Sequence, residues 1–391
     1  MKFRILAIAL LISLIATGCS SPSTLTTKEK IDDFEQLYNE IKEGYPFLEV
    51  NKRQNKEDWL GKKDVFKERV ISTSSDQEFA DELNSILKEL HNGHTELINN
   101  KTWYNVLKDA YEPFGWYDFF DDEDVNSMYN SLKEDRSYGE ESYNDIELKD
   151  LAENKIGYIY IPQMNSANGN IDNDMKRIES YLKRIQDYQS LVINIRGNTG
   201  GTDEYWNKLV SLITDKSYKC GGYRLFRNNS EIINNYTKAR NVKLNDISKL
   251  PQSVINNAPK EVTSMFTDFE YNKEVIEGKS ETPFRGKIYL LVDDYVFSAA
   301  ESFAIFCKEQ NFATIIGTKT SGDGYTYDPV LFKLDNSALI VRMPSTMYLT
   351  DSGISDEEEK VTPDIYIENN KMNEKPGLAD YTNKVLELEG N

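Results

Sequence analysis

Three apolar segments in the second half of the chain limit the fold more than any other feature. Residues 155–161 (KIGYIYI), 191–195 (LVINI) and 287–292 (KIYLLV) have the length and the β-branched or aromatic content of strands. The second is apolar almost throughout, as expected of a strand buried on both faces of a sheet. A helical pattern follows each segment, so the sequence predicts an α/β domain with an internal sheet over residues 151–391.

The region before this domain has the apolar spacing of helices. Residues 30–44 place large apolar side chains on one stripe, and a second stripe starts at the capping box of residues 75–78 and runs to Leu90. Gly93 is a natural stop for that second helix. Residues 101–150 are rich in aromatic and acidic side chains without a clear period. We therefore expect residues 30–150 to form a mostly helical N-terminal region.

The extreme N-terminus has the layout of an export signal. A basic start (Met1 to Arg4) precedes a short apolar run that ends in small residues before Cys19. This ending resembles a bacterial lipobox, which implies removal of residues 1–18 and lipidation of Cys19. Residues 19–29 are rich in serine and threonine and read as a flexible tether. We expect an exported protein that is anchored to the bacterial cell membrane through its lipid and faces outward.

The charge balance excludes one class of partner. The chain has 46 basic and 65 acidic residues, a formal net charge of −19, and no basic tract. Nucleic acid is therefore not an expected partner. Of the three cysteines, Cys220 and Cys307 remain after Cys19, and the sequence alone does not say whether they pair. Cys307 lies on the apolar face of a predicted helix, which favours a buried free thiol.

Two turns between a strand and a helix have the composition of catalytic turns. The glycine-rich turn at 197–201 frees backbone amides at a helix start, where negative charge is stabilised. In the second turn, Ser298 opens a helix between small residues, so it could act as a nucleophile while the amide of Ala299 holds an oxyanion. The alternative is structural, because Ser298-x-x-Glu301 is also a capping box.

The only two histidines, His91 and His94, lie in the short stretch LHNGHTEL. Histidine is the side chain whose ordinary pKa suits proton transfer near neutral pH, so an imidazole base can come from only one place. Two histidine ligands without a nearby cysteine are too few for a zinc site, and neither a metal nor another cofactor is expected. We expect His91 to pack on the last turn of its helix.

Five segments in the second half carry a family resemblance. From Lys155 to Ile367 the chain resembles the catalytic domain of the tail-specific (C-terminal processing) serine peptidases, which has a crotonase/ClpP-like fold. The matching pieces occur in the family's order and are IGYIYIPQM (156–164), LVINIRGNTGG (191–201), KIYLLVDDYVFSAAE (287–301), ATIIGTKTSGDG (313–324) and VTPDIYI (361–367). The resemblance implies that Ser298 is the nucleophile, Glu301 a supporting acid, and Gly200 with Ala299 the oxyanion hole.

The family has two branches that differ in the general base. One branch uses a lysine, but the corresponding position here is Asp323, and residues 101–150 are too short for that branch's PDZ domain. The other branch resembles the tricorn core protease and the retinoid-binding-protein-like peptidases and takes a histidine from an upstream Gly-His-Thr segment, which His94 matches. An acid before the C-terminal Val-x-Pro-Asp supports that histidine.

Glu357 is the supporting acid that the register favours, and Asp356 and Glu358 stay open because Lys360 replaces the family glycine before Val361. The resemblance thus implies a membrane-anchored serine endopeptidase that acts on peptides or proteins. A surface lipoprotein that binds peptide without catalysis is the alternative, and an esterase or amidase would use the same residues.

Overall fold

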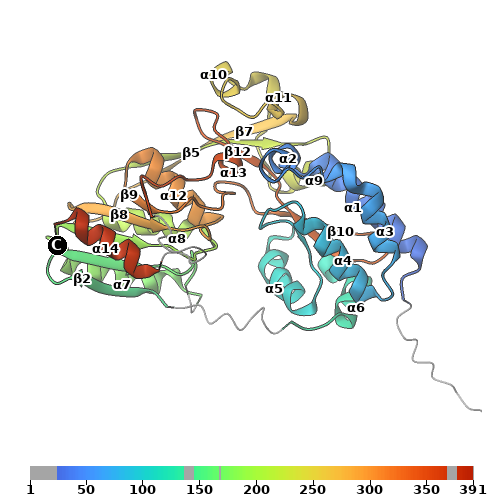
Figure 1. Ribbon diagram of the computed structural model, residues 1–391, viewed down its shortest axis with the longest axis horizontal. Helices are drawn as coiled ribbons and strands as arrows, with labels where there is room; N and C mark the ends of the chain where they lie inside the picture. Colours follow the sequence, from blue (N-terminus) through green and yellow to red (C-terminus); the bar gives the residue numbers. More distant parts are fainter. Residues whose placement is uncertain (1–23, 136–144, 167–168, 368–376, 391) are drawn as a thin grey trace, which may run out of the picture.

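The computed structural model describes residues 24–135, 145–166, 169–367 and 377–390. Figure 1 shows an α/β half and a helical half, with a long two-stranded ribbon and the short helix α13 (Asp356–Glu359) between them. The predicted signal segment and Cys19 lie outside the described residues. The predicted helical region followed by a mixed α/β domain is confirmed.

The helical half is built from amphipathic helices that share one core. Ser75 caps the fourth helix by accepting a hydrogen bond from the Glu78 amide at 3.1 Å, which explains where that helix begins. The apolar stripes of the first and fourth helices are buried together with Trp59 and Phe66. The elements are α1 (Thr27–Gly44), α2 (Leu48–Asn55), η1 (Leu60–Lys62), α3 (Lys63–Ile71), α4 (Asp76–Lys88), α5 (Lys101–Tyr111), η2 (Glu112–Phe114), η3 (Phe119–Asp121) and α6 (Glu123–Ser131).

The α/β half contains a six-stranded sheet that includes all three strands predicted from the sequence. Its order is β13-β9-β8-β4-β3-β2, and every neighbouring pair is parallel except β2 with β3. The strands are β2 (Glu147–Ala152), β3 (Ile156–Tyr160), β4 (Ser190–Asn194), β8 (Lys287–Val292), β9 (Thr314–Gly317) and β13 (Ile365–Tyr366).

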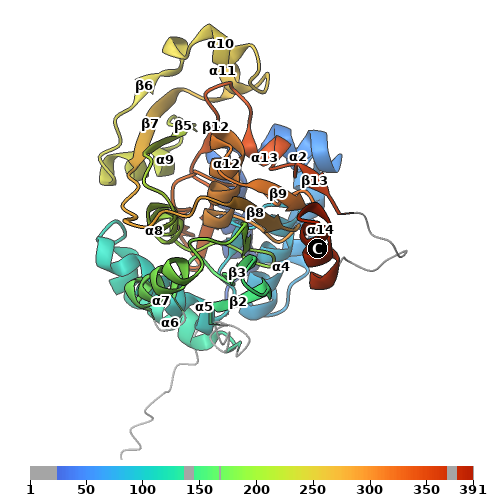
Figure 2. The same cartoon turned by 90° about the vertical axis from the view of Figure 1, so that its left-hand side faces the viewer.

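Both faces of this sheet are covered, which is why its central strands are so apolar. Helices α7 (Ile171–Arg184), α8 (Asp203–Ile213) and α12 (Ala299–Gln310) pack on one face, and α14 (Leu378–Leu388) packs on the other through Tyr381 and Val385. Figure 2 shows α7 and α14 on opposite sides of the strands. β4 and β8 lie side by side at the centre, so the turns that follow them meet at one edge of the sheet.

A second sheet, which the sequence analysis did not predict, bridges the two halves. Its order is β12-β5-β7-β6, and β5 pairs with β7 along nine residue pairs. The strands are β5 (Tyr218–Phe226), β6 (Asn245–Asp246), β7 (Asp268–Ile276) and β12 (Met347–Leu349). Short helices cover the same part of the chain, namely α9 (Glu231–Ala239), η4 (Ile247–Lys249), α10 (Gln252–Ile255) and α11 (Val262–Met265).

A third, small sheet ties the helical half to the C-terminal part of the chain. Its order is β1-β11-β10, where β1 (Glu96–Leu97) pairs antiparallel with β11 (Ile340–Met343), and β11 pairs with β10 (Val330–Lys333). Glu96 and Arg342 face each other in this register and form an ion pair of 2.9 Å. Because β1 begins two residues after His94, this pairing fixes the histidine turn against the second half of the molecule.

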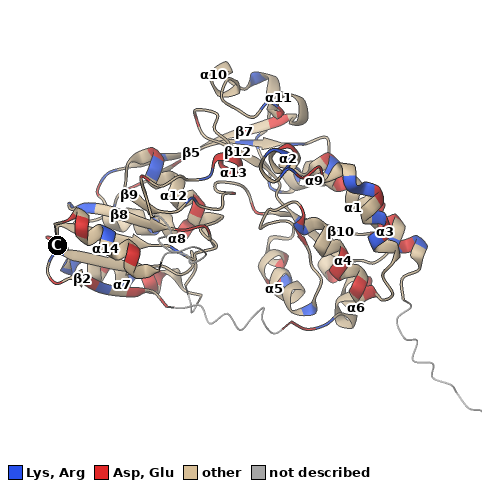
Figure 3. Cartoon of the chain, in the orientation of Figure 1, with Lys and Arg blue, Asp and Glu red and all other residues tan. Residues whose placement is uncertain are grey.

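The charged residues are spread over the surface of both halves, and the two described cysteines are buried. Acidic and basic residues alternate over both halves (Figure 3), and Glu35 of α1 pairs with Lys63 and Lys67 of α3. Cys220 and Cys307 are both buried and free, which confirms the free thiol expected at Cys307. Within the described ranges, no helix is long and apolar enough to span a bilayer.

Candidate active site

Ser298 lies in the sharp turn between β8 and α12. Its φ of 59° and ψ of −125° are unfavourable for a residue with a side chain, and such strain is found at functional turns. Its hydroxyl makes no capping hydrogen bond to α12, so the capping-box alternative is not what the structure shows. Instead the backbone holds the residue, because the Ser298 amide donates to Gly322 O at 3.2 Å and its carbonyl accepts from the Ser302 amide at 2.9 Å. The hydroxyl is left available for chemistry.

The two predicted oxyanion residues lie beside Ser298. Ala299 begins α12, where the first amides have no acceptor within the helix. A Cβ on Gly200 would lie 2.8 Å from Ser298 Cβ and 3.2 Å from the Ala299 nitrogen, so only glycine allows this approach. The Gly200 amide, however, donates to Asn198 Oδ1 at 2.9 Å. Its role as an oxyanion donor stays a prediction, and it requires Asn198 to release that hydrogen.

His94 follows α4 in a turn and is buried, with 9 % of its surface exposed. Asn92 Oδ1 accepts a hydrogen bond from the His94 amide at 2.8 Å, which fixes the turn. The imidazole Nδ1 lies 2.6 Å from Asp323 Oδ2, and the ring packs on Phe297, the neighbour of Ser298, with 4.6 Å between centroids. With Nδ1–H donating to the carboxylate, the lone pair of Nε2 is left free to accept a proton.

His91 does not pack on a helix, in contrast to the prediction. Helix α4 ends at Lys88, and His91 is exposed in a left-handed turn with φ of 53°. The chain turns away from the helix just after Lys88, where the His91 amide donates to Lys88 O at 3.0 Å. The two histidines are therefore separated in environment, and only His94 faces the second half of the molecule.

The carboxylate that contacts the imidazole is Asp323, a residue that the sequence analysis considered only as a missing lysine. Asp323 is buried, with 2 % of its surface exposed, and its φ of 60° turns its side chain toward His94. The sequence signal was present, since the position that carries the base in the lysine branch must lie close to the nucleophile. An acid at that position can orient a histidine that arrives from elsewhere in the fold.

Glu357, the predicted supporting acid, does not hydrogen-bond the imidazole and reaches the site through Asn92. Asn92 Nδ2 lies between the two acids, 3.2 Å from Asp323 Oδ2 and 3.3 Å from Glu357 Oε1. Burial, followed by the charge of Asp323, raises the pKa of Glu357 well above its usual range, while Lys360 opposes the rise. We call His94, Asn92, Asp323 and Glu357 the imidazole cluster. Its geometry is compatible with Glu357 acting on the network through Asn92.

The other two acids that the sequence left open have separate partners. Asp356 Oδ2 accepts a hydrogen bond from the Gly324 amide at 2.8 Å, and Glu358 forms an ion pair with Arg53 at 2.6 Å. Neither contact involves the imidazole. Of the three neighbouring acids, Glu357 is the one that reaches the imidazole cluster.

Glu301 supports the loop that carries Asp323. Its Oε1 accepts from Thr320 Oγ1 at 2.6 Å and from the Val361 amide at 3.0 Å. Burial raises the pKa of Glu301 to about 7, and burial together with Glu301 raises the pKa of Asp356 well above its usual range. We call Glu301 and Asp356 the carboxyl pair. Through these contacts the pair fixes both ends of the loop 320–324, which fits the predicted supporting role of Glu301.

Ser298 and His94 are brought together through two short connections. Phe297 contacts the imidazole ring, and Gly322, which accepts from the Ser298 amide, directly precedes Asp323. Among the residues that the structure describes, no hydrogen bond joins Ser298 Oγ to the imidazole, which is common for catalytic groups without substrate. The fold thus assembles a serine, an imidazole and a carboxylate from three distant segments.

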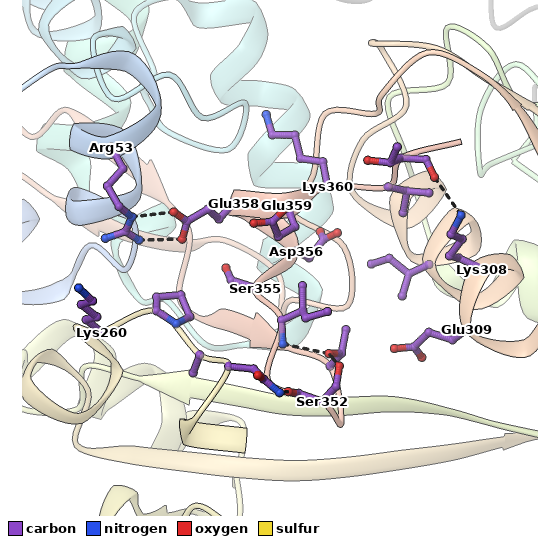
Figure 4. A pocket seen from close by; sticks show the side chains of 18 residues that line it. Arg53, Lys260, Lys308, Glu309, Ser352, Ser355, Asp356, Glu358, Glu359 and Lys360 are labelled. Atoms are coloured by element: carbon purple, nitrogen blue, oxygen red, sulfur yellow. Dashed lines mark hydrogen bonds and ion pairs between the residues drawn. The ribbon is translucent and has the colours of Figure 1, made fainter. Parts of the chain in front are cut away.

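A pocket of about 940 Å³ lies next to this assembly and shares α13 with it. Asp356, Glu358 and Glu359 line the pocket, whereas the intervening Glu357 contacts Asn92 instead. Figure 4 shows the Arg53–Glu358 pair on one side and Lys308 with Glu309 on the other. Helix α13 therefore separates the pocket from the imidazole cluster.

The acids and histidines of the site are not arranged as metal ligands. Over the described part of the chain, no group of three or more histidine, cysteine or acidic side chains could hold a metal ion. The site chemistry is that of an imidazole oriented by a carboxylate beside a serine hydroxyl.

Comparison with known proteins places the chain in a family. The model of peptidase family S41 matches residues 155–367. The chain belongs to peptidase family S41. This confirms the resemblance to the tail-specific peptidases that the five motifs indicated.

Individual relatives of this S41 member are distant. A curated protein of Chlamydia trachomatis serovar D is 24 % identical over 242 residues, which are 54 % of this chain and 40 % of the relative. The chain thus spans well under half the length of that relative.

Solved structures show the same fold at low identity. A candidate peptidase from Parabacteroides merdae is 19 % identical with a TM-score of 0.56, over 86 % of this chain and 89 % of its own. Mature CPAF is 12 % identical with a TM-score of 0.56, over 87 % and 93 % of the two chains. At these identities the likeness concerns the fold.

Proposed function

We propose that this S41 protein is a serine endopeptidase in which Ser298 attacks the peptide carbonyl and His94 is the general base. The observation that carries the proposal is the 2.6 Å contact between His94 Nδ1 and Asp323, because it fixes the tautomer a base requires. Asp323 is the acid that orients the imidazole, and Glu357 acts on it through Asn92.

The reaction follows from the positions of these groups. His94 Nε2 removes the proton of the Ser298 hydroxyl while Oγ bonds to the carbonyl carbon, and the Ala299 amide stabilises the oxyanion. The imidazolium then protonates the departing amine, which breaks the peptide bond and leaves an acyl-serine. Water, deprotonated by the same imidazole, hydrolyses that ester and restores Ser298.

Labelling by a serine-directed phosphonate tests the proposal. We expect a stable adduct on Ser298 that is absent in Ser298→Ala and strongly reduced in His94→Ala. Turnover of a peptide substrate should fall by about a hundredfold to ten-thousandfold in His94→Ala, the usual contribution of a general base. His91→Ala is the matched control, because His91 is exposed and outside the cluster. Full turnover in His94→Ala would contradict the assignment.

A second candidate function is peptide binding without catalysis. One observation favours it, since the Gly200 amide is occupied by Asn198 and the oxyanion site is therefore incomplete as it stands. A folded protein that binds peptides but is never labelled at Ser298 would support this alternative.

We further propose that the protein is exported and held on the outer side of the cell membrane through a lipid on Cys19. The support is the apolar segment before Cys19 and the serine-rich tether after it. Fractionation tests this proposal. Cys19→Ala should move the protein from the membrane fraction to the soluble exported fraction, and retention of the variant on the membrane would contradict it.

A further inference from the structure

Lys360 holds a backbone conformation that favours glycine. Its φ is 51° and its ψ is 174°, a combination that a residue with a Cβ rarely adopts. This is the position where the family motif has its glycine. The chain therefore keeps a long cationic side chain at a place where the backbone alone would prefer none, and such a strained residue is a candidate for function.

The side chain of Lys360 reaches over the loop that contacts the nucleophile. Its Cγ lies 3.4 Å from the point where a Cβ on Gly322 would stand, and Gly322 O accepts the hydrogen bond from the Ser298 amide. Figure 4 shows the Lys360 side chain pointing away from the other side chains that line the pocket. Only Gly322 thus lies between the aliphatic part of the Lys360 side chain and the Ser298 backbone.

The ammonium group of Lys360 has no ion-pair partner among the described residues, although the side chain is only half-buried. Glu357 approaches the same Gly322 point, with its Oε2 at 2.8 Å, and this oxygen has no hydrogen-bond partner among the described residues. Burial and the charge of Asp323 raise the pKa of Glu357, and the charge of Lys360 lowers it, so Lys360 and Glu357 interact electrostatically although no ion pair forms between them.

We propose that Lys360 is a specificity-determining residue whose ammonium group binds a carboxylate of the peptide substrate close to the scissile bond. This inference rests on the proposed peptidase function and adds a substrate class to it. In a chain with a net charge of −19, a lysine without an ion pair whose stem packs on Gly322, the residue that holds the Ser298 amide, can attract an acidic peptide. The carboxylate is that of an aspartate or glutamate side chain, or that of the peptide C-terminus.

Quenched fluorescent peptides with Asp, Asn or Lys around the cleaved bond test the proposal, each with a free and an amidated C-terminus. The wild type should prefer Asp over Asn by roughly fivefold in kcat/KM, mainly through KM, as one partly exposed ion pair allows. Lys360→Met should remove this preference and Lys360→Glu should reverse it toward Lys. Lys260→Met is the matched control, because Lys260 lines the pocket, is exposed and has no ion pair among the described residues.

Two further measurements separate this inference from the proposed function. Binding of the same peptides to Ser298→Ala, followed by fluorescence anisotropy, reports the preference without turnover. If that variant binds acidic and neutral peptides equally, the specificity role is wrong even where the wild type cleaves peptides. If acidic peptides bind preferentially but the wild type cleaves none, the inference stands and the catalytic proposal fails.

A third variant excludes a folding artefact. Lys360→Gly removes the charge and relieves the backbone, so it should be at least as stable as the wild type and still lose the preference for acidic peptides. If kcat falls equally on all peptides in Lys360→Met while the preference for Asp is unchanged, the specificity role is wrong. Lys360 would then act on the site through the charge of Glu357.

Discussion

The imidazole cluster and the carboxyl pair are both buried beside the loop 320–324, yet their partners differ. Asp323 belongs to this loop and Glu301 binds it through Thr320, and both acids are buried. Asp323 contacts an imidazole, which can gain and lose a proton near neutral pH, whereas Glu301 accepts hydrogen bonds from a hydroxyl and a backbone amide and is paired with the buried carboxyl group of Asp356. Burial alone therefore does not distinguish a functional acid from a supporting one. The chemistry of the partner does.

The largest expected effect comes from Asp323→Asn. The amide can donate to Nδ1, which would place the imidazole proton on Nε2 and remove the base, so kcat should fall by roughly ten-thousandfold. The free energy of unfolding should change far less than activity. Turnover measured beside thermal unfolding checks this, with Glu359→Gln as an exposed acidic control. Wild-type turnover in Asp323→Asn would show that Asp323, like Glu301, only supports the structure.

A smaller effect, of a different kind, is expected from Glu301→Ala. The Thr320 hydroxyl and the Val361 amide would lose the Glu301 acceptor and keep only their contacts with each other, so the free energy of unfolding should fall by roughly 1–3 kcal/mol. Activity should decline with stability rather than ahead of it. Urea unfolding of the purified variant measures the change, and Glu301→Gln, which keeps one acceptor, should lose less. A stable but inactive Glu301→Ala would show that the carboxyl pair does more than support the loop.

The smallest effect is a pH dependence of stability. The pKa of Glu301 is about 7 in the folded protein and close to 4.5 in the unfolded chain, so the folded state binds the proton more tightly. Stability from this group is present below about pH 4.5 and is lost as the pH rises toward 7, at most roughly 3 kcal/mol. The difference in unfolding free energy between wild type and Glu301→Gln should follow this curve. A difference that does not change with pH would contradict the assignment.

Part of the site could be predicted from local sequence patterns, because some of its residues lie in short segments just after predicted strands. The strands β4 and β8 have unbroken apolar runs, and the turns after them contain Gly200 and Ser298. The fold and the family were therefore predictable. The left-handed backbone at Ser298, which decides against a helix cap, depends on contacts with Gly322 that no local pattern contains.

Other parts could not be predicted because they depend on pairing between distant segments. β5 and β7 mix polar and apolar residues and gain their structure from each other. Asp323 meets His94 only after the loop 320–324 is fixed by Glu301 and the histidine turn by β11. For the same reason, the sequence favoured Glu357 by register but did not reveal that Asn92 lies between it and Asp323.

The pairing of β1 with β11 has a consequence for how the protein gains activity. It joins Glu96 to Arg342, so the histidine turn is held by residues that are synthesised almost at the end of the chain. A chain that ends before Ser298 contains the proposed base without Asp323, without the proposed nucleophile and without β11, the strand that holds the histidine turn. In the proposed peptidase mechanism, cleavage therefore requires that β11 has been synthesised and has paired with β1.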